Sequence, residues 1–383
     1  MKKVLFATTA LIATAGVAAA DVTISGYGRF GLDYNNANAK WGSGTGLNKW
    51  DVPGSGASKT NLTSRLRLNF DMSTETDAGV TLGAQFRVQA DSDNGEARTG
   101  GWNGARFYAS YGGLEVGVGN IYGAIEWAPL VYLDTRSLGT GITGMKDVHA
   151  VTNVNGFNGE VPVGGKYIAG SEYYNWDFYT SRDYYYSIGS GANGVEVMYS
   201  AGGFSGHLSY SKQNESIYDG LAGNGVDGAP VPVVAYNKGT RRAAAFISYN
   251  WSNWTVTLAA QDSNQEWEDK VFFAIQGDFG QYWAKAAIAD NDGIKKYGLY
   301  GGMDFGAASS LAVWVNHEEK VKQSDIDNGR LNNDRSVNAW GTAGTAYGIN
   351  YSYDLGGGAS FEAGAQHLAN KQTQVQAGVY FSF

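Results

Sequence analysis

The last nine residues, VQAGVYFSF, alternate between apolar side chains and polar or small ones. Successive side chains of a β-strand point to opposite faces. One face of this segment is therefore apolar from Val375 to Phe383, while the other is polar or small. Such a strand fits a soluble domain, with its apolar face on a core, or the wall of a barrel between lipid and a wet lumen.

The same period-two alternation recurs in segments of about ten residues along the chain. In residues 63–72, for example, Leu66 and Leu68 fall on one face, and Arg65 and Arg67 fall on the other. Sixteen such segments are predicted, at 22–34, 63–72, 80–91, 105–111, 114–120, 194–201, 204–212, 241–250, 253–262, 270–279, 282–290, 295–306, 309–318, 343–355, 359–367 and 374–383. An even strand number is typical of bacterial outer-membrane barrels, so the pattern predicts an all-β, 16-stranded antiparallel transmembrane β-barrel.

The connections between these segments alternate in length. Tight turns are predicted at 112–113, 202–203, 250–253, 280–281 and 356–358, and longer polar loops at 35–61, 91–104, 121–193, 213–240 and 319–342. Short turns at one end and long loops at the other are typical of a barrel with periplasmic turns and extracellular loops. The loop 121–193 is far longer than ordinary connections, which favours a functional element.

Composition agrees with strands and excludes one class of partner. The chain has 55 glycines, 25 tyrosines and 5 prolines, and 17% of its residues are charged. Few helix formers and many aromatic residues favour sheet over helix. The formal net charge of −8 argues against a nucleic-acid partner, because phosphate binding requires a basic surface. The absence of cysteine is compatible with a secreted protein that does not rely on disulfides.

The amino terminus has the features of a secretory signal. Lys2 and Lys3 precede a short apolar run, and three alanines stand before Asp21. This order of basic residues, apolar stretch and A-x-A site predicts a cleaved signal peptide at residues 1–20. The mature chain is then 21–383, a single barrel domain.

Aromatic residues gather near the ends of the predicted strands, for example Tyr27, Trp251, Tyr282, Trp283 and Phe383. Amphipathic rings settle where a membrane meets water, and they form girdles around the apolar band of a barrel. We therefore expect these residues to mark the two membrane interfaces.

Alternation in the first four strands directs a set of arginines away from the apolar face and into the lumen: Arg29, Arg65, Arg67, Arg87 and Arg106. Such charges stay hydrated on a wet wall but are costly in a soluble core. The long loop 121–193 carries acids, among them Glu126, Asp134 and Asp147. If the loop folds inward, these eight residues form a pore constriction with opposed charges and a transverse field.

Four stretches together resemble a known family: DVTISGYGRFGLDY at 21–34, YSAGGF at 199–204, YSYDLGGGAS at 351–360 and VYFSF at 379–383. In their order and spacing they resemble the general porins of Gram-negative outer membranes, of the Rhodobacter (alphaproteobacterial) type. The resemblance implies a trimeric barrel for passive diffusion of ions and small hydrophilic solutes. It also implies a third loop folded into the lumen and a terminal aromatic, Phe383, read by the barrel-assembly machinery.

Two other functions are alternatives. One is a soluble, secreted, glycan-binding β protein. The other is an outer-membrane barrel hydrolase that uses His207 with Ser205 or Ser209, although alternation turns all three toward the lumen, away from lipid substrates. We therefore expect no enzyme activity.

No cofactor is expected, because the four histidines are widely spaced and form no ligand pattern. Calcium binds oxygen ligands, which leave little trace in a sequence. No motif supports a Ca²⁺ site, and the acidic loop is the place where one would lie. The G-x-G-x-x-G match at 26–31 lies inside a strand pattern, which does not fit a dinucleotide site.

Overall fold

The computed structural model describes residues 21–36, 58–93, 96–97, 100–133, 182–185, 187, 189, 191–213, 216–222, 231–237, 239–264, 268–319, 322, 324, 344–367 and 373–383. Their strands are β1 (Asp21–Asn35), β2 (Thr60–Glu75), β3 (Thr81–Asp93), β4 (Glu96–Ala97), β5 (Gly101–Trp102), β6 (Arg106–Tyr111), β7 (Leu114–Gly119), β8 (Gly194–Ala201), β9 (Phe204–Lys212), β10 (Ser216–Ala222), β11 (Val231–Asn237), β12 (Arg241–Trp251), β13 (Trp254–Ser263), β14 (Lys270–Phe279), β15 (Tyr282–Asn291), β16 (Ile294–Phe305), β17 (Ser309–Glu318), β18 (Gly344–Gly356), β19 (Ala359–His367) and β20 (Thr373–Ser382). A four-residue helix, α1 (Ala124–Trp127), follows β7.

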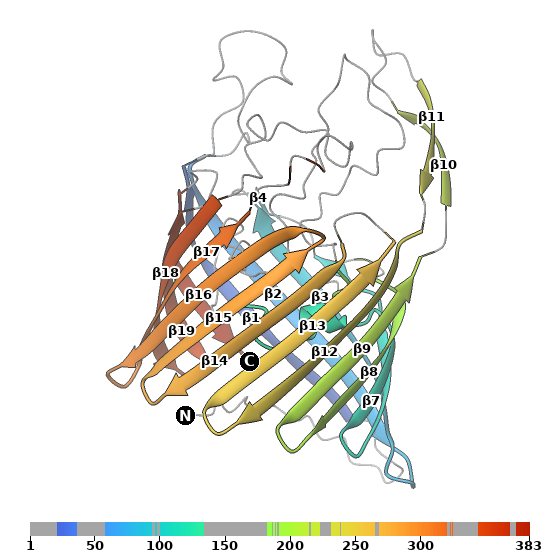
Figure 1. Cartoon of the computed structure of the whole chain (residues 1–383), viewed down its shortest axis with the longest axis horizontal. Helices are drawn as coiled ribbons and strands as arrows, with labels where there is room; N and C mark the ends of the chain where they lie inside the picture. Colours follow the sequence, from blue (N-terminus) through green and yellow to red (C-terminus); the bar gives the residue numbers. More distant parts are fainter. Residues whose placement is uncertain are drawn as a thin grey trace.

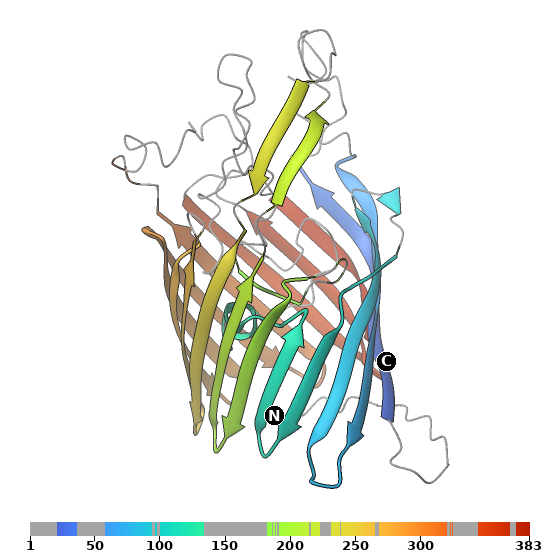
Figure 2. The same ribbon diagram turned by 90° about the vertical axis from the view of Figure 1, so that its right-hand side faces the viewer.

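The strands form a closed antiparallel barrel (Figures 1 and 2). Its wall consists of β1–β3, β6–β9 and β12–β20, which are sixteen strands, and each pairs with its neighbours along the chain. The last strand, β20, pairs with β1 and closes the sheet, with Tyr27 opposite Ser382 and Asn35 opposite Gln374. The predicted 16-stranded antiparallel barrel is confirmed.

Two short elements of the sheet and one hairpin were not predicted. The two-residue strands β4 and β5 both pair with β3, inside the predicted loop 91–104. The hairpin β10–β11 lies within the predicted loop 213–240 and stands above the barrel rim (Figures 1 and 2). None of these elements changes the order of the sixteen strands in the wall.

Most of the tight turns lie at the same end of the barrel as the start of β1 and the end of β20. The pairs Gly112-Gly113 and Gly202-Gly203 have positive φ at both positions, from 57° to 85°. Hairpin turns of type I′ require this geometry so that the turn twist matches the strand twist, and glycine adopts it without a steric penalty. One tight turn, Asp292-Gly293 between β15 and β16, lies at the opposite end, so loop lengths are not fully segregated.

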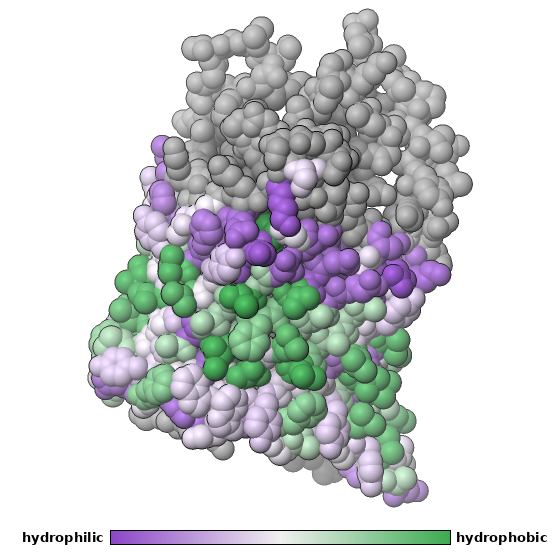
Figure 3. All heavy atoms as spheres, viewed as in Figure 1, coloured by the Kyte–Doolittle hydropathy of each residue, from purple (hydrophilic) through white to green (hydrophobic). Residues whose placement is uncertain are grey.

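The outer face of the wall is an apolar belt. Leucines that point outward are largely exposed, with Leu62 74%, Leu208 60% and Leu299 62% accessible. Figure 3 shows this belt across the wall, with a hydrophilic band above it. A continuous apolar surface of this kind is rare on soluble monomers, whereas lipid covers it in a transmembrane barrel.

Helices give a separate result. Among the described residues, no helix is long and apolar enough to cross a membrane.

The aromatic residues near strand ends divide between the two faces of the wall. Trp251 and Tyr282 lie beside the short turns and are 42% and 51% exposed, as expected for an interface girdle. Tyr27 and Trp283 were wrongly placed in the girdle. Alternation turns both side chains inward. The Tyr27 ring lies 5.2 Å from the Arg67 guanidinium, and Trp283 packs against a cluster of buried apolar residues inside the barrel.

At the seam between β1 and β20, two phenylalanine rings cover two glycines on the outer face. The Phe381 ring lies over Gly28, and the Phe383 ring lies beside Gly26. The backbones of Gly26 and Phe383 exchange two hydrogen bonds of 2.9 and 3.1 Å. A β-carbon on Gly28 would overlap the Phe381 ring, so the bare glycine allows the ring to cover the seam.

This geometry predicts that Gly28→Ala destabilises the barrel by about 1–3 kcal/mol, because the added methyl displaces the Phe381 ring. The measurement is tryptophan-monitored unfolding in detergent, with Gly301→Ala as the matched control. A β-carbon on Gly301 would meet only the Trp283 carbonyl oxygen, at 3.6 Å. Equal stability of the two variants would contradict the proposed role of Gly28.

Candidate functional site

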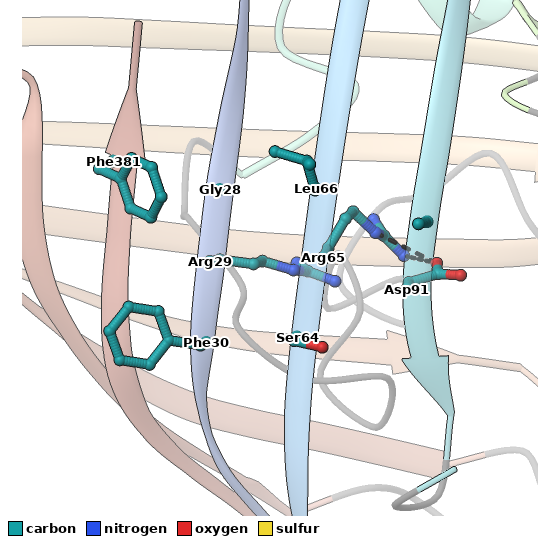
Figure 4. A pocket seen from close by; sticks show the side chains of 9 residues that line it. Gly28, Arg29, Phe30, Ser64, Arg65, Leu66, Asp91 and Phe381 are labelled. Atoms are coloured by element: carbon teal, nitrogen blue, oxygen red, sulfur yellow. Dashed lines mark hydrogen bonds and ion pairs between the residues drawn. The ribbon is translucent and has the colours of Figure 1, made fainter. Parts of the chain in front are cut away.

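Four arginines cluster on the inner faces of β1, β2 and β3. Arg29 is directly opposite Arg65 in the pairing of β1 with β2, and Arg67 and Arg87 lie on the same inner face of β2 and β3. We call Arg29, Arg65, Arg67 and Arg87 the arginine cluster. Figure 4 shows Arg29 and Arg65 side by side, with the Arg65 guanidinium 2.8 Å from the carboxylate of Asp91. The structure thus brings together four of the five predicted arginines.

Arg67 and Arg87 bind neutral partners. Arg67 Nε donates a 2.8 Å hydrogen bond to the side-chain oxygen of Gln89. Arg67 Nη2 and Arg87 Nη1 both donate to the hydroxyl of Ser187, at 3.0 and 3.2 Å. The Arg87 guanidinium also lies 4.3 Å above the ring of Tyr185. Residues from the returning end of the long loop therefore contact the arginine cluster.

Arg106 does not join this cluster, although it is on the inner face as predicted. Its side chain is 1% exposed and lies between two carboxylates, with Nε 2.5 Å from Glu196 and Nη2 2.7 Å from Glu115. The ring of Tyr122 covers it at 4.1 Å. A buried, doubly paired guanidinium of this kind has a structural role in the wall and is withdrawn from the pore surface.

The fully buried carboxylate of Glu196, on β8, holds the start of the long loop. Its second oxygen accepts hydrogen bonds from the backbone amides of Tyr122 and Gly123, at 2.9 and 3.2 Å. The Nε2 atom of His207 lies 3.0 Å from the same oxygen. A charged acceptor shared by several donors makes strong hydrogen bonds in a dry environment. Glu196 therefore pins the loop to the inside of the wall.

After this anchor, the loop packs on the inner face of the wall. Ile125 and Val131 are 1% and 2% exposed and belong to one apolar cluster with residues of β12–β17. The wall side of the cluster consists of aromatic and small residues: Phe246, Ala259, Phe272, Ala274, Ala287, Ala289, Tyr300 and Trp314. Lys285 of β15 adds hydrogen bonds to the carbonyl oxygens of Leu130 and Tyr132, at 3.1 and 2.7 Å. Residues 121–133 thus lie inside the barrel, as Figure 2 shows for α1.

The outgoing and returning arms of the loop are tied together. Arg182 lies 2.6 Å from the carboxylate of Glu126 and 2.7 Å from the hydroxyl of Tyr132. Burial acts to lower the pKa of Arg182, but the negative charge of Glu126 outweighs it and the pKa lies above its ordinary value. Burial also raises the pKa of Tyr132. The next residue, Asp183, pairs with Arg242 of β12 at 3.2 Å.

The three acids predicted for the constriction have different outcomes. Glu126 lies in α1 and is paired with Arg182, so its charge is compensated locally. Asp134 and Asp147 lie outside the described residues. Sequence reasoning missed Glu196, which alternation with the outward-facing Val195 and Val197 places on the inner face. An inward acid on a strand was a usable signal for an ion pair with Arg106.

Two of the three residues suspected of hydrolysis, His207 and Ser209, are occupied in anchoring the loop. His207 contacts Glu196, and the hydroxyl of Ser209 accepts a 2.9 Å hydrogen bond from the amide of Ala124. Within the ranges that the structure describes, no group of three or more His, Cys, Asp or Glu residues could hold a metal ion.

A hollow of about 330 Å³ lies at β20, β1, β2 and β3. By alternation its outward-pointing residues are small at Gly28, Ser64 and Ala90, and large at Phe30 and Leu66 (Figure 4). Arg29, Arg65 and Asp91 also line this hollow, although alternation turns their side chains toward the inner face of the wall.

Comparisons with known proteins agree on one family. A family model described as Gram-negative porin matches residues 7–373. A porin of Fuscovulum blasticum is 27% identical over 371 residues, which cover 95% of this chain and 100% of the relative.

Solved structures share the fold. A mutant of Rh. blastica porin matches with a TM-score of 0.63 at 23% identity, over 94% of this chain and 100% of that chain. A variant of the same porin, in which two basic and two acidic residues are replaced by alanine, matches with the same TM-score at 24% identity and the same coverage.

The anchor is testable by hydrogen–deuterium exchange. Glu196→Gln removes the charge that holds Arg106 and the amides of Tyr122 and Gly123, at a cost of roughly 3–5 kcal/mol for breaking a buried pair. We expect faster amide exchange in peptides covering 121–128. Glu115→Gln is the control, since Glu115 contacts Arg106 but not the loop; identical exchange in both variants would remove Glu196 from the anchor.

Proposed function

The chain belongs to the Gram-negative porin family, and from this premise we propose that its pore is constricted between the arginine cluster and the loop that begins at Ile121. The protein is an outer-membrane channel. In our proposal, ions and small hydrophilic solutes cross it by passive diffusion. The constriction sets which of them cross easily.

One observation carries the proposal: the arginine cluster and the outgoing arm of the loop, residues 121–133, lie on opposite walls. Counted around the closed sheet of sixteen strands, β14 is the eighth strand from β2, which is halfway around. The arginine cluster is centred on β2, and the apolar cluster that holds the loop spans β12–β17. A loop packed on one wall narrows the lumen toward the other.

The electrostatic part of the proposal needs acids on the loop side. Glu126 is compensated by Arg182, so we assign this role to Asp134 and Asp147, together with the arginines of the cluster. Arg106, bound by two carboxylates, supports the wall and adds little field to the pore. Opposed charges across a narrow passage with low-dielectric walls orient dipolar solutes and disfavour apolar ones.

We propose that the protein has no catalytic activity and needs no cofactor. The amides and side chains around His207 and Ser209 support this view, because they are used to anchor the loop. Any Ca²⁺ site would involve acids of the loop 121–193.

A homotrimer is the proposed assembly. The outer face of the first strands and the last would supply its contacts, together with the loop 91–104. The hollow around Gly28, Ser64 and Ala90 supports this choice, because it leaves room for side chains of a neighbouring barrel. Lipid covers the rest of the belt.

Biogenesis is proposed to follow from the two termini. Residues 1–20 act as a cleaved signal peptide for export through the inner membrane. The carboxyl-terminal Phe383 then serves as the signal for the barrel-assembly machinery. Its ring lies on the outer face, 48% exposed, where another protein can reach it.

Charge neutralisation tests the arginine cluster. The variant Arg65→Gln, Arg67→Gln and Arg87→Gln should move ion selectivity toward cations, because it removes positive charge from the narrowest part of the pore. The reversal potential across a planar bilayer in a KCl gradient measures this. Arg241→Gln is the control, since its side chain is exposed at the outer rim and pairs with Asp262. An unchanged reversal potential in the triple variant would remove these arginines from the constriction.

Deletion of Phe383 tests the assembly signal. We expect a marked loss of the protein from the outer membrane, with unchanged single-channel conductance in the molecules that do insert. Quantitative immunoblots of outer-membrane fractions measure the first effect and bilayer recordings the second. Normal outer-membrane levels would show that Phe383 is not the signal.

A further inference from the structure

We propose that Arg67, Arg87 and Ser187 form a binding subsite for phosphate-type oxyanions inside the pore. The inference rests on the proposed function, because it gives the arginine cluster a preferred solute class. The ligand chemistry is a doubly charged phosphate group, either free or as a monoester.

The first observation is that two guanidinium groups converge on one neutral oxygen. Arg67 Nη2 and Arg87 Nη1 lie 3.0 and 3.2 Å from the hydroxyl oxygen of Ser187. Two like charges at one neutral acceptor repel each other, and a hydroxyl offers no charge to offset the repulsion. The Ser187 oxygen therefore occupies the position that one oxygen of an oxyanion would take.

The second observation is a contrast with three other arginines inside the barrel. Arg106, Arg182 and Arg242 each have a carboxylate within 2.5–2.7 Å, from Glu196, Glu126 and Glu268 respectively. Among the residues that the structure describes, Arg67 and Arg87 donate only to neutral groups. Within the described part of the chain, these two guanidiniums thus have no carboxylate partner, and we assign them to an external anion.

Arg87 retains unused donor capacity. Its Nε is buried and has no hydrogen-bond partner among the described residues. A guanidinium presents its donors in a planar fork that matches two oxygens of a phosphate. Nη1 points to the Ser187 oxygen position, and the unused Nε lies on the other edge of the guanidinium, beside Nη2, so Arg87 can offer a further donor to a second oxygen of the anion.

Aromatic rings hold both guanidiniums in place. The ring of Tyr185 lies 4.3 Å from the Arg87 guanidinium, and the ring of Tyr27 lies 5.2 Å from that of Arg67. Stacking of this kind limits rotation and excludes water from one face of each cation. The charges are then preorganised for an anion, which lowers the entropic cost of binding.

Asp91 does not neutralise Arg67 and Arg87. Its carboxylate accepts hydrogen bonds from Arg65 at 2.8 Å and from the side-chain amide of Gln89 at 3.1 Å. The side-chain oxygen of Gln89 accepts from Arg67, so Gln89 lies between Asp91 and Arg67. The Asp91 carboxylate therefore compensates the charge of Arg65, while the pair Arg67 and Arg87 stays positive.

The test is phosphate block of chloride current through the purified full-length protein in planar bilayers. Inorganic phosphate and glucose 6-phosphate are titrated separately at pH 7.5 and constant ionic strength, with gluconate as the monovalent reference. We expect a saturable loss of current with both phosphates and none with gluconate. If only one of the two phosphates saturates, that arm identifies the source of the ligand.

Variants then locate the site. Arg87→Gln should weaken the apparent phosphate affinity about tenfold or more, because it removes charged hydrogen bonds. Ser187→Ala should bind phosphate at least as tightly as the parent protein, because phosphate displaces the hydroxyl. Arg87→Lys, which keeps the charge without the fork, should be intermediate and covers the case in which Arg87→Gln fails to fold. Arg241→Gln is the control and should match the parent protein.

The outcomes separate the two proposals. Conducting channels whose selectivity depends on the arginine cluster, but which show no saturable phosphate block, would overturn the subsite alone. A saturable block of equal affinity in Arg87→Gln and the parent protein would also overturn it. A failure to form any channel would overturn the proposed function itself.

Discussion

The buried carboxylate of Glu196 is the interaction on which the interior of this barrel depends. It joins β8 to β6 through Arg106 and to the long loop through the amides of Tyr122 and Gly123. A wide barrel has no solid core, so a loop stays inside only if the wall supplies partners for its backbone. Glu196 supplies a charged acceptor at the first turn of the loop, and the residues that follow therefore lie against the apolar patch on β12–β17.

The two halves of the inner wall have different compositions because they do different work. On β12–β17 the inner face carries aromatic and alanine side chains, which give the loop a dry surface to pack on. On β1–β3 the inner face carries arginines, which lie opposite the apolar patch and are contacted by Tyr185 and Ser187 of the returning arm of the loop. An apolar wall that binds the loop and a charged wall opposite it together place the charge where the passage is narrowest. One part of the sheet thus stabilises the packed loop, and another part acts on the solutes.

The sixteen strands, the closure by β20 and the outward girdle at Trp251 and Tyr282 were predictable, because period-two alternation is local. The inner apolar patch was not. In β14 and β15, residues such as Phe272 and Ala287 are apolar although they face inward, and alternation alone assigns that face to water. The long loop covers them, and no local pattern reveals which strands it will cover. Tyr27 was misplaced for a related reason: being near a strand end does not determine the face.

Arg106 illustrates why the candidate site was only partly predictable. It shares residue type and face with Arg87, and a sequence reading treats the two alike. Their roles differ because Glu196, ninety positions further along the chain, lies two strands away in the barrel and pairs with Arg106, whereas the partners of Arg87 are a serine and a tyrosine from the returning loop. The register of strands distant in sequence decides which arginine receives a carboxylate. Arg106, buried between two carboxylates, becomes part of the wall, whereas Arg87, which contacts a hydroxyl and an aromatic ring, keeps its charge available to the pore.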